Sequence, residues 1–226
     1  MEKIKHNLST LNKQIINAEK KYNRKPGSVS LLAVSKKHSI ELIKIAQSLG
    51  QKHFGENFVQ EGVEKIHALR SKELCWHFIG HVQSNKTRII AENFDWVHTV
   101  DRLKVAERLS KQRPETAKDL NICVQVNIDC EDAKSGVYIE ELKPICEAIR
   151  ELPKLKLRGL MCIPIVKKEH NDQRRSFAEL SRLKKSINHG ACDIDTLSMG
   201  MTNDYMAAIQ EGATIIRIGT ALFGAR

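Results

Sequence analysis

From about residue 29 onward, the chain alternates between short apolar segments and amphipathic helical segments, and this alternation constrains the fold most strongly. Such alternation favours an α/β protein with a mostly parallel sheet, because parallel neighbours need a crossover that a helix supplies. The predicted strands are 30–35, 52–55, 76–80, 96–100, 121–128, 155–162, 195–199 and 215–219. Eight such units predict a closed (β/α)8 TIM barrel, in a single domain spanning residues 1–226. An open doubly wound sheet is disfavoured, because no glycine-rich turn with a following acidic residue comes after the first strand.

A further helix is predicted ahead of the barrel. Ile4, Leu8, Leu11 and Ile15 recur at helical spacing, and Pro26-Gly27 ends the segment. Residues 1–25 are therefore expected to form a leading helix that covers one end or side of the barrel. The helices predicted between strands are 40–49, 58–69, 85–92, 102–111, 139–151, 172–187 and 204–211.

Charge and hydropathy narrow the classes of partner. The net charge is +10, but the basic residues are scattered and aromatic residues make up only 5% of the chain. This pattern favours a solvated basic surface over a nucleic-acid site, and it is consistent with an anionic ligand. The longest apolar runs are too short to span a bilayer, and the charged segment from Met1 to Ser9 lacks a secretory apolar region. We expect a cytoplasmic protein without a membrane or nucleic-acid partner.

The cysteines do not form a recognisable metal motif. None belongs to a C-x-x-C pair, so we expect reduced, mostly buried thiols. The six are Cys75, Cys123, Cys130, Cys146, Cys162 and Cys192. His77 and His81 are four residues apart, but they fall on a predicted strand end and turn, where helical zinc-binding geometry is missing. No metal site is predicted.

The first predicted strand is followed by two lysines. In a barrel, chemistry is expected at the carboxyl ends of the strands. Because strand residues alternate faces, Lys36 shares the face of Leu32 and Val34, whereas Lys37 points the other way. A lysine walled by apolar residues has its pKa lowered, and a neutral amine is what Schiff-base formation requires. Two solvated lysines at a strand end are the alternative, which the spacing by itself favours.

The last two strand ends carry small and hydroxylated residues. Ser198 and Gly200 end the seventh strand, and Gly219-Thr220 ends the eighth. Loops at these places in such barrels often bind phosphate through backbone N–H groups, which glycine lets approach closely. Tight turns without a ligand are the alternative. The segments Gly55-Glu56-Asn57 and 80–86 line the expected mouth as well. The alternative is that Asn57 and Asn85 are only helix caps. Likewise, Glu56, His81 and Lys86 would then be solvated side chains without a ligand.

Taken in order, these segments resemble the pyridoxal phosphate homeostasis protein family. The resemblance runs from the first strand to nearly the end of the chain. Its motifs are Ala33-Val34-Ser35-Lys36, Phe54-Gly55-Glu56-Asn57, Trp76-His77-Phe78-Ile79-Gly80-His81-Val82-Gln83-Ser84-Asn85-Lys86, Arg158-Gly159-Leu160-Met161, Leu197-Ser198-Met199-Gly200-Met201 and Arg217-Ile218-Gly219-Thr220. It implies a fold-type III barrel similar to the N-terminal domain of alanine racemase, with pyridoxal 5'-phosphate as the cofactor.

The resemblance also implies roles for individual residues. Lys36 would carry the cofactor as an internal aldimine, and Arg217 would face the pyridine nitrogen. Ser198, Gly219 and Thr220 would hold the phosphate, while Asn57, Met199 and His81 would neighbour the cofactor. The chain departs from the family pattern at positions beside this site, which are His38, Phe58 and Cys162.

The predicted function is cofactor homeostasis: storage, buffering or delivery of pyridoxal phosphate, with apo-enzymes as transient partners. An arginine at the ring nitrogen opposes ring protonation, which weakens the electron sink that amino-acid chemistry needs. We also expect no second domain of the kind that supplies a racemase with its tyrosine base, and none of Tyr22, Tyr138 and Tyr205 is an evident substitute. A monomer is expected. The alternatives are a weak racemase or decarboxylase that uses Lys36, and a barrel that binds a sugar phosphate or nucleic acid instead.

Overall fold

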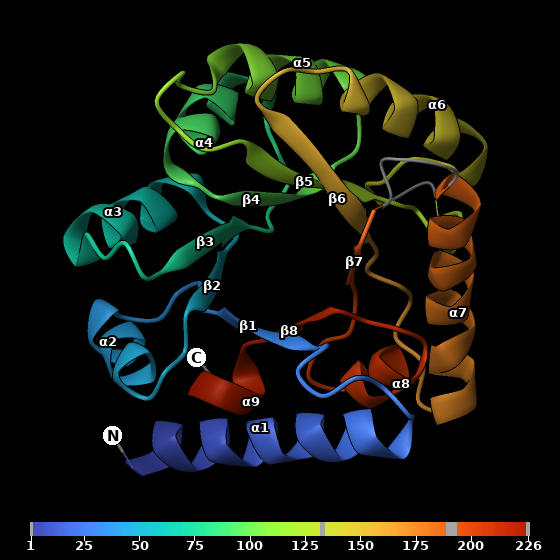
Figure 1. Cartoon of the computed structure of the whole chain (residues 1–226). Helices are drawn as coiled ribbons and strands as arrows, with labels where there is room; N and C mark the ends of the chain where they lie inside the picture. Colours follow the sequence, from blue (N-terminus) through green and yellow to red (C-terminus); the bar gives the residue numbers. More distant parts are fainter. Residues whose placement is uncertain (1, 132–133, 189–193, 225–226) are drawn as a thin grey trace.

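The computed structural model is a closed barrel of parallel strands in which each strand pairs with its neighbours in chain order and β8 returns to β1 (Figure 1). It describes residues 2–131, 134–188 and 194–224. Over these ranges the strands are β1 (Ser30–Val34), β2 (His53–Glu56), β3 (Cys75–Phe78), β4 (Trp96–Val100), β5 (Leu120–Gln125), β6 (Leu155–Met161), β7 (Thr196–Ser198) and β8 (Ile215–Ile218). The predicted TIM-barrel fold is confirmed.

Helices follow the strands and form the outer layer. In the same described ranges they are α1 (Glu2–Lys21), α2 (Ile40–Ser48), α3 (Val59–Leu69), α4 (Thr87–Asn93), α5 (Leu103–Gln112), α6 (Ile139–Arg150), α7 (His170–Ile187), α8 (Tyr205–Gln210) and α9 (Thr220–Phe223), with a 3-10 turn at Ser84–Lys86. The leading helix α1 packs against α2, α8 and α9 (Figure 1). It buries the predicted stripe of Ile4, Leu8, Leu11 and Ile15.

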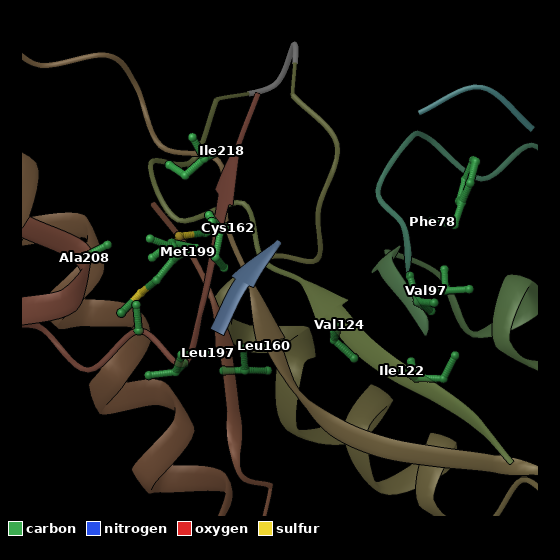
Figure 2. Close-up of a cluster of buried hydrophobic side chains, with 14 of the residues drawn as sticks. Phe78, Val97, Ile122, Val124, Leu160, Cys162, Leu197, Met199, Ala208 and Ile218 are labelled. Atoms are coloured by element: carbon green, nitrogen blue, oxygen red, sulfur yellow. The ribbon is translucent and has the colours of Figure 1, made fainter. Parts of the chain in front are cut away.

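The apolar side chains form two layers, because alternate residues of each strand point to opposite faces. Those that face outward pack under the helices in the main core, part of which Figure 2 shows. A smaller cluster fills the inside of the barrel and includes Leu32 and Val34 of β1 and Ile215 of β8. Lys36, two residues after the end of β1, lines a cavity together with Val34.

The boundaries differ from the prediction mainly at strand ends. β5 stops at Gln125 rather than at 128, because the chain leaves the ladder and Val126 bridges to Val137. The predicted helix 85–92 is a 3-10 turn followed by α4, and α7 begins at His170 rather than at 172. These loops leave the sheet at the carboxyl ends of the strands, where they shape the mouth of the barrel.

In residues 2–131, 134–188 and 194–224, no helix is both long and apolar enough to cross a bilayer. Within these ranges the cysteines are free thiols, and the expectation that most are buried holds for Cys123, Cys146 and Cys162. Cys130 is exposed and Cys75 is half-buried. Cys192 lies outside the described residues.

Candidate functional site

A cavity of about 310 Å³ opens at the carboxyl ends of the strands, which we call the C-terminal mouth. Five of the residues predicted for the site line it: Lys36, Asn57, Arg217, Gly219 and Thr220. They come from the ends of β1, β2 and β8, so the cavity joins segments that are far apart in the sequence. Chemistry in a barrel of this kind is expected at this end.

Lys36 lies in the turn after β1 and is half-buried. Lys37, its neighbour, is exposed, and its Nζ lies 5.9 Å from the centroid of the Phe58 ring. Lys37 also has a positive φ of 60°, so the chain turns away from the barrel there. The turn therefore directs Lys36 to the cavity and Lys37 to solvent.

A buried polar network holds this turn in place. The Ser35 hydroxyl donates to Glu56 Oε1 at 2.6 Å. Lys65, on α3, donates to the Ser35 carbonyl at 2.7 Å, to Glu56 Oε1 at 2.8 Å and to Glu61 Oε1 at 2.6 Å. Burial raises the pKa of Glu56, although the bonds from Lys65 and Ser35 oppose the shift. Glu56 is thus not a solvated carboxylate. Sequence reasoning missed Lys65, for which the four-residue spacing from Glu61 on one helix face was the available signal.

Asn57 is held against the next strand end. A Cβ atom at Gly80 would lie 2.0 Å from the Asn57 carbonyl oxygen, so only glycine allows this approach. Asn57 is not the predicted helix cap, since Phe58 occupies the N-cap position of α3. Its Oδ1 atom is buried and has no hydrogen-bond partner among the described residues. Asn57 itself lines the cavity, and a buried acceptor without a protein donor is consistent with a ligand that supplies one.

Arg217 is buried at the floor of the C-terminal mouth. Its Nη1 donates to the Ser198 carbonyl at 2.6 Å and to the Ser198 hydroxyl at 2.9 Å, and its Nη2 donates to the Cys162 carbonyl at 2.9 Å. Burial lowers the pKa of Arg217, but an arginine stays charged in a protein. Lys36, Lys167 and Arg217 line the cavity together with Asp204. The cations outnumber the carboxylate, which favours an anionic ligand.

Three predicted residues of β7 and its end do not line this cavity. Ser198 faces inward beneath Arg217, whereas Met199 faces outward and belongs to the main core, where Figure 2 shows it on the side of Ala208. Gly200 has a φ of 94°, and a Cβ atom there would lie 2.6 Å from Ala208 Cβ. Gly200 thus serves a turn that packs on α8. The loop residues that line the cavity instead are Met201, Thr202 and Asn203.

His81 lines an adjoining cavity of about 350 Å³ rather than the main one. Asn57, Ile79 and Ile163 line both cavities. The His81 side chain is 53% exposed, and its Nδ1 lies 4.0 Å from Asp101 Oδ2. The structure therefore puts His81 at the rim.

Beneath Arg217, a row of imidazoles crosses the inside of the barrel. His98 Nδ1 lies 2.8 Å from the Ser198 hydroxyl, His77 Nδ1 lies 2.8 Å from His98 Nε2, and His53 Nδ1 lies 3.0 Å from His77 Nε2. Burial lowers the pKa of His98 to about 3, and the charge of Arg217 adds to the shift. Burial likewise lowers the pKa of His77 well below its ordinary value. These two rings are neutral at physiological pH.

Relatives match this chain along its whole length. The chain is 50% identical over 226 residues to the pyridoxal phosphate homeostasis protein of Pseudomonas aeruginosa, a match that covers 100% of this chain and 97% of that protein. It is 48% identical over 230 residues to the protein of the same name from Vibrio alginolyticus, covering 100% and 99%. The chain belongs to the pyridoxal phosphate homeostasis protein family. The resemblance predicted from the sequence is confirmed.

Two further comparisons agree with membership of this family. The sequence profile of the family described as alanine racemase, N-terminal domain, matches residues 1–226. PipY from Synechococcus elongatus, solved with pyridoxal phosphate bound, superposes with a TM-score of 0.85 at 36% identity, covering 98% of this chain and 100% of PipY.

Proposed function

We propose that this protein binds pyridoxal 5'-phosphate at the C-terminal mouth and holds it covalently through Lys36. The observation that carries the proposal is the arrangement of Lys36, Arg217 and Asn57 around one cavity. PipY, which was solved with this cofactor, supports it. When bound, the cofactor supplies an aldehyde for the lysine amine and an electron-withdrawing pyridine ring.

The cavity offers separate partners for the two ends of the cofactor. Gly219, Thr220 and the loop 201–203 would bind the phosphate, since the first N–H groups of a helix lack intrahelical acceptors. Arg217 would face the ring nitrogen, and Asn57 would accept a hydrogen bond beside the ring. Ser198 acts beneath this site by holding Arg217. Met199 and Gly200 would support the phosphate loop through their packing, and His81 would lie at the rim.

Arg217 favours a carrier over an efficient enzyme. Three protein acceptors fix its guanidinium, so its positive charge would stay beside the ring nitrogen of a bound cofactor. That charge opposes protonation of the ring and weakens the electron sink. We therefore assign the protein to cofactor homeostasis, through storage, buffering or delivery of pyridoxal phosphate, without robust amino-acid turnover.

Delivery requires contact with an apo-enzyme. Several large apolar side chains are exposed on segments that border the mouth: Phe58, Ile163, Ile165 and Val166. Of these, Ile163 and Val166 also line the cavity. Such side chains suit a brief docking contact with partner enzymes. We further propose a monomeric, cytoplasmic protein in a single domain with no nucleic-acid partner.

The lysine pair provides a matched test of cofactor binding. Purified protein should show the yellow colour of a Schiff base, and borohydride should fix the cofactor mass on the peptide that contains Lys36. Lys36→Ala should abolish the fixed adduct. Lys37→Asn should keep it, since asparagine tolerates the positive φ at that position. A colourless protein that cannot be reconstituted, or an adduct on Lys37, would contradict the proposal.

A second experiment separates a carrier from an enzyme. Transfer of the cofactor to an apo-enzyme is measured with and without a scavenger of free pyridoxal phosphate. Transfer that persists with the scavenger supports delivery, whereas transfer that the scavenger abolishes supports buffering. Incubation with single enantiomers of amino acids tests the alternative. Robust racemisation or amine release that is lost in Lys36→Ala would replace the carrier assignment with an enzyme.

A further inference from the structure

The opposite opening of the barrel, at the amino ends of the strands, holds a cluster of soft and imidazole side chains. His53 begins β2 and Cys75 begins β3, and the two are register partners across the parallel ladder. His77 lies two residues after Cys75, so it shares the face of that thiol. The strand pairing thus brings two imidazoles and one thiol together inside the N-terminal mouth, on the far side of the barrel from Lys36.

Two of the three distances among these side chains lie within about 0.3 Å of those around a tetrahedral zinc ion. The facing nitrogens of His53 and His77 are 3.0 Å apart, and Cys75 Sγ is 3.4 Å from His77 Nε2. All three ligand atoms lie within 4.8 Å of one another. Zn–N bonds of about 2.0–2.1 Å and a Zn–S bond of about 2.3 Å give separations of about 3.3 Å between nitrogens and about 3.6 Å from nitrogen to sulfur.

The surroundings supply the other parts of a metal site. With Nε2 used as a ligand atom, the Nδ1 of His77 carries the ring proton and faces His98 Nε2 at 2.8 Å. Zinc-bound imidazoles almost always have such an acceptor on their second nitrogen. The carboxylate of Asp95, which accepts a bond from the Trp76 amide, acts electrostatically on both His53 and Cys75. Burial, together with this negative charge, raises the pKa of the Cys75 thiol to about 12, so a metal ion must displace the thiol proton when it binds.

The N-terminal mouth also leaves room for a fourth ligand. A cavity of about 340 Å³ is lined by His53 and His77, together with Ser30, Thr196 and Thr214. It provides an entry path and space for a water molecule or a small anion. Three protein ligands with an open fourth position are the arrangement of accessible zinc sites.

We propose that His53, Cys75 and His77 bind one zinc-type divalent transition metal ion at the N-terminal mouth of the barrel. The site is separate from the cofactor site and does not depend on it. It departs from the sequence-based prediction that the chain has no metal site. That prediction paired His77 with His81, whereas the fold pairs His77 with His53 and Cys75.

Zinc and cobalt titrations of the full-length protein test the site. Protein treated with a chelator and a reductant is titrated with Zn²⁺ in competition with a chromophoric chelator. We expect one ion per chain, and at least about a hundredfold weaker binding in both His53→Gln and Cys75→Ala, since even outer partners of a site change affinity by 10–100-fold. These two residues are half-buried, so their substitution avoids the fully buried His77. Cys130→Ser and His170→Gln, which remove an exposed thiol and an exposed imidazole, should leave the affinity unchanged.

Cobalt identifies the ligands independently of affinity. Co²⁺ should give intense ligand-field bands in the red, where pyridoxal phosphate does not absorb, and a thiolate charge-transfer band that Cys75→Ala removes. Zinc binding that His53→Gln and Cys75→Ala leave intact would overturn the proposal. So would weak octahedral cobalt bands, or the absence of stoichiometric binding.

Discussion

Ser198 holds Arg217 through two different oxygens. The guanidinium Nη1 lies 2.6 Å from the Ser198 carbonyl and 2.9 Å from the Ser198 hydroxyl, so one residue of β7 supplies two of the three protein acceptors of this β8 cation. Only the hydroxyl can be removed by substitution. Its contribution to the site can therefore be separated from that of the backbone.

Ser198→Ala should weaken binding of pyridoxal phosphate by about tenfold, because a hydrogen bond to a charged group contributes about 1.5–3 kcal/mol and the two carbonyl partners of Arg217 remain. Absorbance titration of the cofactor-free protein measures this change. Ser186→Ala, which removes an exposed hydroxyl on α7, is the control. An unchanged affinity would show that the hydroxyl does not position Arg217.

Lys65→Met should destabilise the protein by about 3–5 kcal/mol, because it leaves the buried Glu56 carboxylate without its cation. The double variant Glu56→Gln/Lys65→Met should recover most of this loss. Urea unfolding at pH 7.5 gives the free energies. The exposed pair of Arg88 and Glu92 is the comparison, and Arg88→Ala should change stability by less than about 0.5 kcal/mol. Equal effects of Lys65→Met and Arg88→Ala would contradict the importance of the buried network.

Gly80→Ala should cost about 1–3 kcal/mol or more, since the added Cβ would meet the Asn57 backbone oxygen at 2.0 Å. It should also weaken cofactor binding by displacing Asn57. Gly55→Ala is the matched variant. Its Cβ would meet side-chain ends of Ile79 and Leu32 at 3.1–3.3 Å, which can shift, so the cost should be smaller. Thermal unfolding and cofactor titration rank the two, and the reverse order would refute this account of Gly80.

Cysteine reactivity should follow burial. Desolvation raises the pKa of Cys123, Cys146 and Cys162 to about 12, so their thiols stay protonated and inert, whereas Cys130 is exposed. Iodoacetamide at pH 8 should label Cys130 at least about a hundredfold faster than these three. Timed labelling followed by peptide mass spectrometry measures the rates. Comparable rates in the native protein, with urea-unfolded protein as the reference, would be inconsistent with the buried positions.

The period-two alternation of strands accounts for most of what could be predicted. It predicted the barrel fold, and it predicted that Lys36 faces the barrel interior while Lys37 points away. The same alternation, applied at the seventh strand, separates Ser198 from Met199: the serine faces the barrel interior and the methionine the helices. Met199 was included in the predicted site through resemblance alone, which carries no information on side-chain direction.

Contacts that depend on how two elements pack or pair could not be predicted from the sequence. Lys65 contacts Glu56 because α3 packs against β2 with one particular rotation about the helix axis. The amphipathic pattern of α3 does not specify which of its polar residues points inward. His53 meets Cys75 because β2 and β3 pair at one register. A shift of one residue would turn those side chains to the opposite face of the sheet.

The hydrogen bonds that link His77, His98 and Ser198 can all run in one direction or all in the other. Each neutral ring carries one N–H, so a proton on His77 Nδ1 obliges His98 to donate to Ser198, and a proton on His77 Nε2 obliges Ser198 to donate to His98. Neither ring can change its tautomer alone, because two lone pairs or two protons would then face each other. The orientation of the Ser198 hydroxyl beneath Arg217 is therefore tied to the protonation of a nitrogen near the other end of the barrel, with no movement of the backbone.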